Sequence, residues 1–168
     1  VNWAGMADGA FYKGLLQEAQ GLMEGERNWV ANCANVAALV YHGLNEGPKA
    51  GAVNWAGFYV VDAAKPQELI LGPFLGKPAC LRIRHGKGVC GTAWAQAETA
   101  RIADVHAFPG HIACDATSDS EIVVPLIVAG KVVGVLDLDS TLLDCFSEED
   151  QAGLEAVAAA VSAACDWS

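Results

Sequence analysis

The stretch EIVVPLIVAGKVVGVLDLD, residues 121–139, decides the fold class of this chain. Two apolar runs, 121–128 and 132–139, flank the turn residues Ala129 and Gly130, a pattern that is typical of a β-hairpin. Strands joined by so short a turn pair antiparallel, because a parallel pair needs a long crossover connection. The stretch therefore predicts two long antiparallel strands at the centre of the fold.

The segments on either side of this hairpin predict helices at both ends of the chain. Apolar residues recur at helical spacing in 11–23 and again in 29–44, with a break at Gly25. A last helix is predicted from Ser147, whose hydroxyl caps the backbone while Asp150 reaches back to complete a capping box. Its apolar stripe runs from Leu154 to Cys165.

Further strands are predicted between the helices. The apolar and aromatic run 53–61 indicates a buried strand, and 69–71 a shorter one. The Gly- and Pro-rich region 72–91 is predicted to be mostly loop, with a short extended piece at 81–83 and a brief helix at 92–98. Helices at both ends of an antiparallel sheet give an α+β fold, and the length suits one domain over residues 1–168.

Composition excludes several classes of partner. The net charge of −10 repels nucleic-acid phosphates and anionic lipid headgroups, so neither nucleic acid nor a membrane is expected to bind. No apolar run approaches the roughly 20 residues that cross a bilayer. We expect a cytoplasmic protein, in which six cysteines serve as thiols, as metal ligands or as core residues rather than as three permanent disulfides.

Three of the cysteines are predicted to be chemically active. Cys33 and Cys165 fall on apolar helical stripes and Cys145 precedes Phe146, so these three are expected to be structural. The others, Cys80, Cys90 and Cys114, lie in loops.

The two thiols with the most reactive surroundings differ in what would activate them. Cys90 in GKGVCG is expected directly before a helix, where the helix dipole and Lys87 would lower its pKa. Cys114 follows His106 and His111 in a polar loop, so it has candidate proton-transfer neighbours.

A cluster of acids is expected beside these thiols. Asp137 and Asp139 are two apart on a strand, so both point to one face, while Leu136 and Leu138 point to the other. Glu121 opens the neighbouring strand. A solvated acidic face is the plain alternative. In a pocket, however, such acids bind an ammonium group, and their crowding raises the pKa of one member so that it donates a proton.

Two other kinds of site are disfavoured by spacing. A zinc site built from Cys90, His106, His111 and Cys114 has only one pair of ligands two to four residues apart, so no metal is predicted. The segment 86–91 matches G-x-G-x-x-G, but the following helix is short and no second βαβ half follows. A tight turn is the simpler interpretation, and no cofactor is expected.

Five segments together resemble one known family, the free methionine-(R)-sulfoxide reductases, which are built on a stand-alone GAF domain. They are NWAGFYVVD (54–62), LGPFLGKPAC (71–80), GKGVCGTAW (86–94), DVHAFPGHIACDATSDSEIVVPL (104–126) and GVLDLDS (134–140). The resemblance runs from about the second helix to the C-terminus. One departure is the loop 62–68, which looks longer than the family pattern.

The resemblance implies an antiparallel GAF sheet of about six strands and an enzyme that reduces the free amino acid sulfoxide. It implies Cys114 as nucleophile, Cys80 as the thiol that resolves the sulfenic acid to a disulfide, and thioredoxin as reductant. Glu121, Asp137 and Asp139 match the acids that bind the ammonium group and protonate the oxygen. Trp55 matches the aromatic residue that packs on the substrate methyl group, and Tyr59 is expected to line the same pocket.

Several questions stay open at this level. Helix position favours Cys90 as the attacking thiol and the family pattern favours Cys114. A homodimer is neither required nor excluded. The alternatives in other classes are a GAF sensor that binds a small ligand without turnover and, third, a nicotinamide-dependent enzyme.

Overall fold

The computed structural model describes residues 1–111 and 116–168. In chain order the elements are α1 (Asp8–Met23), α2 (Trp29–Glu46), β1 (Val53–Asp62), β2 (Lys65–Gly76), β3 (Arg82–Arg84), α3 (Gly88–Gln96), β4 (Ala100–Ile102), the 3₁₀ turn η1 (Val105–Ala107), β5 (Ser120–Val128), β6 (Lys131–Ser140) and α4 (Glu148–Ala164). The predicted central hairpin is confirmed as β5 and β6, and the helices at both ends are confirmed as well.

The strands form one curled antiparallel sheet. In the described part of the chain it has six strands in the order β3-β2-β1-β6-β5-β4, and each neighbouring pair is antiparallel. The expected α+β class with a sheet of about six strands is therefore confirmed. Strand β6 of the hairpin lies between β1 and β5, so three apolar strands lie side by side in the middle of the sheet.

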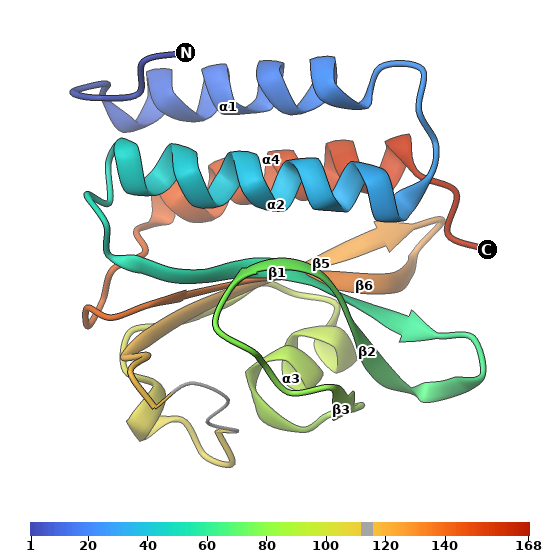
Figure 1. The fold of residues 1–168 in the computed structure, drawn as a ribbon. Coiled ribbons are helices and arrows are strands. Elements are labelled where there is room, and N and C mark those ends of the chain that lie inside the picture. The colour runs from blue at the N-terminus through green and yellow to red at the C-terminus, as the bar shows by residue number, and fades with distance from the viewer. Residues whose placement is uncertain (112–115) are drawn as a thin grey trace.

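The two faces of the sheet bury different cores (Figure 1). On one face α2 and α4 lie against the strands, and α1 packs on these two helices from the side away from the sheet. Side chains such as Phe58, Ile122, Leu136 and Leu138 point to this side. On the other face α3 covers the alternate residues of the same strands. Because successive side chains of a strand point to opposite faces, residues that alternate with this first core, such as Glu121, Asp137 and Asp139, lie on the side of α3.

A buried polar cluster joins the three helices of the larger core. The capping box predicted at the start of α4 is confirmed, with Ser147 and Asp150 bonded reciprocally. Asp150 is fully buried, accepts a hydrogen bond from the Tyr12 hydroxyl at 2.8 Å and forms an ion pair with Lys49. One carboxylate thus holds α1, α4 and the end of α2 together.

Replacing this carboxylate is expected to be costly. Asp150→Ala leaves the largely buried ammonium group of Lys49 without its ion-pair partner, and it also removes one half of the capping box of α4. The free energy of unfolding should therefore fall by about 3–5 kcal/mol. Urea unfolding followed by circular dichroism measures this loss. Glu148→Ala, two residues earlier in α4, changes an exposed side chain; it is the control and should cost less than about 0.5 kcal/mol. Equal losses in the two variants would contradict the assigned role.

The structure corrects three boundaries. β2 extends over Lys65–Gly76 rather than 69–71, because Gly72 and Pro73 lie at an irregularity of the β1 pairing where the ladder tolerates them. Strand β4 was not predicted. α3 begins at Gly88 rather than Thr92, so Cys90 lies inside the helix and not before it. The apparent loop 62–68 is mostly strand, with only residues 63 and 64 between β1 and β2.

No helix in the described ranges has both the length and the apolar character that a bilayer span requires.

Candidate active site

The floor of a pocket is formed by the three central strands on the side facing α3. Trp55 of β1 pairs with Asp139 of β6, and Asp139 pairs in turn with Glu121 of β5. One pleat further along, Asp137 lies opposite Gly57, where a Cβ atom would clash with the Cβ atom of Phe74. The period of two and the hairpin register therefore bring all three predicted acids to one patch of the sheet.

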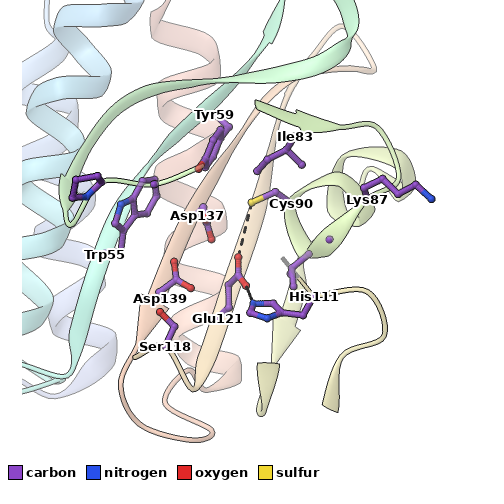
Figure 2. A pocket seen from close by; sticks show the side chains of 14 residues that line it. Trp55, Tyr59, Ile83, Lys87, Cys90, His111, Ser118, Glu121, Asp137 and Asp139 are labelled. Carbon is purple, nitrogen blue, oxygen red and sulfur yellow. Dashed lines mark hydrogen bonds and ion pairs between the residues drawn. The ribbon is translucent and has the colours of Figure 1, made fainter. Parts of the chain in front are cut away.

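The walls of the pocket are formed by the segment between β2 and β3, by α3, and by residues between η1 and β5. Figure 2 shows the side chains of Cys90, Glu121, Asp137 and Asp139 gathered around a common space, with Trp55 and Tyr59 on one side and His111 on the other. The lining residues are Trp55, Tyr59, Pro78, Ala79, Ile83, Lys87, Gly88, Val89, Cys90, His111, Ser118, Glu121, Asp137 and Asp139. The predicted set is thus brought together, apart from Cys80, which does not line the pocket, and Cys114, which lies outside the described residues.

The aromatic side of the pocket is held rigidly. The Trp55 ring stacks on Tyr59 at 5.9 Å and on Phe74 at 5.1 Å between ring centroids. Its indole N–H donates to the Lys77 carbonyl oxygen at 3.1 Å. The Tyr59 hydroxyl donates to the Cys80 carbonyl oxygen at 2.8 Å, which ties the segment that carries Cys80 to the pocket floor. An apolar group entering the pocket meets a fixed indole.

The two buried acids of the pocket floor resist ionisation. Glu121 is 6% exposed and Asp137 is 5% exposed. Burial, followed by the nearby charge of Asp139, raises the pKa of Glu121 to about 8. Burial and then the Glu121 carboxylate raise the pKa of Asp137 well above its ordinary value. Glu121 therefore keeps its proton at neutral pH more readily than an exposed carboxyl group does, and the pKa of Asp137 shifts in the same direction, as the crowding argument predicts.

Cys90 lies in the first turn of α3, 4% exposed, with its thiol 3.9 Å from Glu121 Oε1. Burial, and then the charges of Asp137 and Glu121, raise its pKa well above the ordinary value. The expectation that the helix N-terminus lowers this pKa is wrong. Lys87 does not help, because its ammonium group points away from Cys90 (Figure 2). The arrangement favours a neutral thiol that donates a hydrogen bond to Glu121.

The remaining cysteines fall into two groups. Cys80 is disulfide-bonded. The free thiols in the described ranges are Cys33, Cys90, Cys145 and Cys165. Cys33 and Cys165 belong to the core under the helices, and Cys145 is half-buried beside it, so the structural reading of these three is confirmed.

The two histidines before Cys114 face different partners. His111 lines the pocket, with Nε2 3.7 Å from Glu121 Oε2, and burial lowers its pKa. His106 instead pairs with Asp119 at the surface, at 3.1 Å. Ser118 also lines the pocket, although the sequence offered no signal for it. A hydroxyl in a polar loop looks the same whether it faces a pocket or water.

The glycine-rich segment is a tight turn and not a nucleotide loop. Gly86 and Gly88 adopt positive φ angles of 75° and 62°. A Cβ atom on Gly91 would lie 2.5 Å from the Arg84 carbonyl oxygen, so a larger residue cannot enter α3 at this position. The strands next to α3 are antiparallel, which excludes the βαβ unit that a dinucleotide fold requires.

Comparison with known proteins supports one family. A family model described as a GAF domain matches residues 33–166. The free methionine-R-sulfoxide reductase of Escherichia coli is 49% identical over 149 residues, 89% of this chain and 85% of that protein. The protein of the same name from Saccharomyces cerevisiae is 46% identical over 152 residues, 90% of this chain and 83% of that protein.

A solved structure agrees with both sequence relatives. The X-ray structure of free methionine-R-sulfoxide reductase from Neisseria meningitidis in complex with its substrate superposes with a TM-score of 0.89 at 40% identity. It matches 98% of this chain, and 93% of that chain is covered. The chain therefore belongs to the free methionine-(R)-sulfoxide reductases, a family built on the GAF domain.

Proposed function

We propose that this chain reduces free L-methionine-(R)-sulfoxide to L-methionine. The observation that carries the proposal is the buried acidic floor of the pocket beside a fixed indole. A floor of carboxyl oxygens suits the ammonium group of a free amino acid, and an indole suits a methyl group on sulfur. The printed names of the Escherichia coli and Saccharomyces cerevisiae relatives support the same activity.

Each part of the substrate has a complementary partner. The ammonium group binds at Asp137 and Asp139 of β6, which leaves Glu121 on the neighbouring strand β5 as the proton donor. The S-methyl group packs on Trp55, with Tyr59 beside it. A residue inside a peptide has no ammonium group, so it would leave the buried acids unpaired, which costs binding free energy.

The reductive step uses one thiol and one proton. The Cys114 thiolate attacks the sulfoxide sulfur, and a protonated carboxyl group, Glu121, gives its proton to the oxygen. The oxygen passes to the cysteine, so methionine leaves and Cys114 remains as a sulfenic acid. The sulfoxide gains two electrons and the thiolate loses two. The raised pKa of Glu121, about 8, supports this role because the acid form is present at neutral pH.

The sulfenic acid is then resolved by a second thiol. Cys80 condenses with it, releasing water and forming a Cys80–Cys114 disulfide, which thioredoxin reduces by thiol exchange. The disulfide-bonded state of Cys80 supports a redox role for this cysteine. The raised pKa of Cys90 supports Cys114 rather than Cys90 as the attacking thiol. Cys90 then serves the site as a neutral hydrogen-bond donor to Glu121.

Selectivity for the free amino acid tests this function. Pre-reduced protein should reduce free L-methionine-(R)-sulfoxide at least about 100-fold faster than its N-acetyl derivative, because the derivative cannot replace the ion pair with the acids. Methionine formed in the first turnover is measured by chromatography. The (S)-sulfoxide of free methionine is the matched control for non-specific thiol chemistry. Equal rates with the free and acetylated substrates would contradict the assigned binding mode.

The surroundings of the enzyme remain predictions. We propose thioredoxin as the partner, the cytoplasm as the location and residues 1–168 as one domain, whose N-terminal helix α1 packs on α2 and α4. A homodimer is compatible with the proposal and is not needed to complete the pocket.

A further inference from the structure

We propose that Cys90, Glu121 and Asp137 form a zinc-binding site on the floor of the pocket, and that Zn²⁺ bound there excludes methionine sulfoxide. The exclusion rests on the function proposed above, whereas the metal site does not. Cys90 is also the pocket thiol that the proposed electron transfer leaves unused. The metal would act as an inhibitor and not as a cofactor.

The three donor atoms lie near enough to one another to share one metal ion. One ligand atom from each of Cys90, Glu121 and Asp137 lies within 4.8 Å of the other two. With a Zn–S bond of about 2.3 Å and a Zn–O bond of about 2.1 Å, tetrahedral geometry separates sulfur from oxygen by roughly 3.6 Å. The observed distance from Cys90 Sγ to Glu121 Oε1 is 3.9 Å. This pair of atoms is therefore within a few tenths of an ångström of the separation that a tetrahedral zinc site needs, and the third ligand atom, from Asp137, lies within 4.8 Å of both.

One buried carboxyl oxygen without a hydrogen-bond partner is a candidate ligand for a cation. Asp137 is 5% exposed, and its Oδ1 atom has no hydrogen-bond partner among the described residues. Buried polar atoms are rarely left unpaired, because the loss of water costs free energy that nothing returns. A cation bound here would satisfy this oxygen and would also neutralise the crowded acids. The ammonium group of the substrate would do the same, which is why the two ligands compete.

The donor set selects zinc over hard cations. Calcium and magnesium prefer sites made entirely of oxygen atoms, whereas a thiolate beside carboxylates suits a softer divalent metal such as Zn²⁺. His111 contacts the second oxygen of Glu121 at 3.7 Å, so it can orient the carboxylate as an outer-shell partner. Three protein ligands leave a fourth position open for water.

The sequence does not indicate these three ligands as a set, because they are far apart in the chain. A zinc site is recognisable in a sequence when pairs of its ligands lie two to four residues apart. Cys90 comes from α3, Glu121 from β5 and Asp137 from β6, and only the hairpin register brings them together. His106, a candidate ligand in the sequence, does not face the pocket; it pairs with Asp119 at the surface.

The metal site is tested in the oxidised protein, where Cys80 is held in a disulfide and Cys90 remains a free thiol. Zn²⁺ affinity is measured by competition with a chromophoric chelator, and Co²⁺ is used to report thiolate ligation through its charge-transfer absorption. Wild type should bind one metal per chain. Cys90→Ser should lose the charge-transfer band and weaken Zn²⁺ binding by at least about 100-fold, beyond the roughly 10- to 100-fold cost of an outer-shell change.

Two further variants keep the test sharp. Asp137→Asn should weaken Zn²⁺ binding while keeping the thiolate band at saturating Co²⁺, because it removes an oxygen ligand only. Cys145→Ser removes a half-buried thiol outside the pocket and should leave both readouts unchanged. Circular dichroism confirms that each variant is folded. Equal Zn²⁺ affinity in wild type and Cys90→Ser would overturn the site.

The exclusion of substrate has a separate readout. Calorimetry on the same oxidised protein should detect binding of methionine sulfoxide without metal and lose it at saturating Zn²⁺. Binding of the sulfoxide that is unchanged by bound Zn²⁺ would overturn the competition. A protein that binds Zn²⁺ through Cys90 but never reduces the sulfoxide would count against the proposed function alone. A protein that reduces the sulfoxide but binds no Zn²⁺ would count against the metal site alone.

Discussion

Glu121→Gln should slow the first turnover of free methionine-(R)-sulfoxide by at least about 100-fold, the lower range of what general acid catalysis contributes. The amide has nearly the shape of the protonated acid but cannot release a proton. Glu121 has the environment that this role needs, because burial and the charge of Asp139 raise its pKa to about 8. The first-turnover rate is measured by quenching reactions of pre-reduced protein at successive times and quantifying the methionine formed. A loss of less than threefold would remove Glu121 as the proton donor.

The control variant is Asp119→Asn, which changes an acid close in sequence whose side chain is 40% exposed and pairs with His106. Its first-turnover rate should stay within about twofold of wild type, because surface ion pairs contribute little. The contrast between the two variants separates an effect of the pocket from a general effect of lost negative charge.

The same carboxyl group should give the reaction an alkaline limit. The acid form of Glu121 donates the proton, so its concentration is highest below the pKa and falls as the pH rises through about 8. First-turnover rates at low substrate concentration report the free enzyme and should decline through this range. In Glu121→Gln the decline should disappear along with most of the rate. A wild-type profile that stays flat from pH 7 to pH 10 would contradict the assignment.

Cys114→Ser should abolish methionine formation, whereas Cys90→Ser should keep at least about a tenth of the first-turnover rate. A hydroxyl in place of the attacking thiol has a far higher pKa and is a much weaker nucleophile. The Cys90 thiol is held neutral by burial and by the Asp137 and Glu121 charges, so its loss removes only a hydrogen bond to Glu121. Loss of turnover in Cys90→Ser with activity kept in Cys114→Ser would exchange the two roles.

The face of the sheet that carries the site was predictable from the sequence. Alternation of Leu136 and Leu138 with Asp137 and Asp139 requires the acids to share one side, and the short turn at Ala129 fixes the pairing with β5. Trp55 was predicted to be a site residue only from the resemblance to the family. Its pairing with Asp139 depends on the order β1-β6-β5, which local patterns do not contain.

The state of Cys90 could not be predicted, because two opposing effects had to be compared. A helix N-terminus stabilises a nearby anion by about 0.3–1 kcal/mol. Complete burial shifts a pKa by up to about 3–5 units, each equivalent to roughly 1.4 kcal/mol, so burial outweighs the dipole. The sequence shows the glycines before α3, but it does not show that the first turn packs onto Glu121 and Asp137. Burial is a property of the assembled layers.

The most direct test of the central claim is one turnover without an external reductant. Pre-reduced, desalted wild-type protein is mixed with free L-methionine-(R)-sulfoxide, methionine is quantified, and the disulfide is mapped by mass spectrometry. We predict about one methionine per chain and a new bridge between Cys80 and Cys114. Tight binding of the sulfoxide with no methionine formed and all thiols still reduced would contradict the account and leave a GAF binding module.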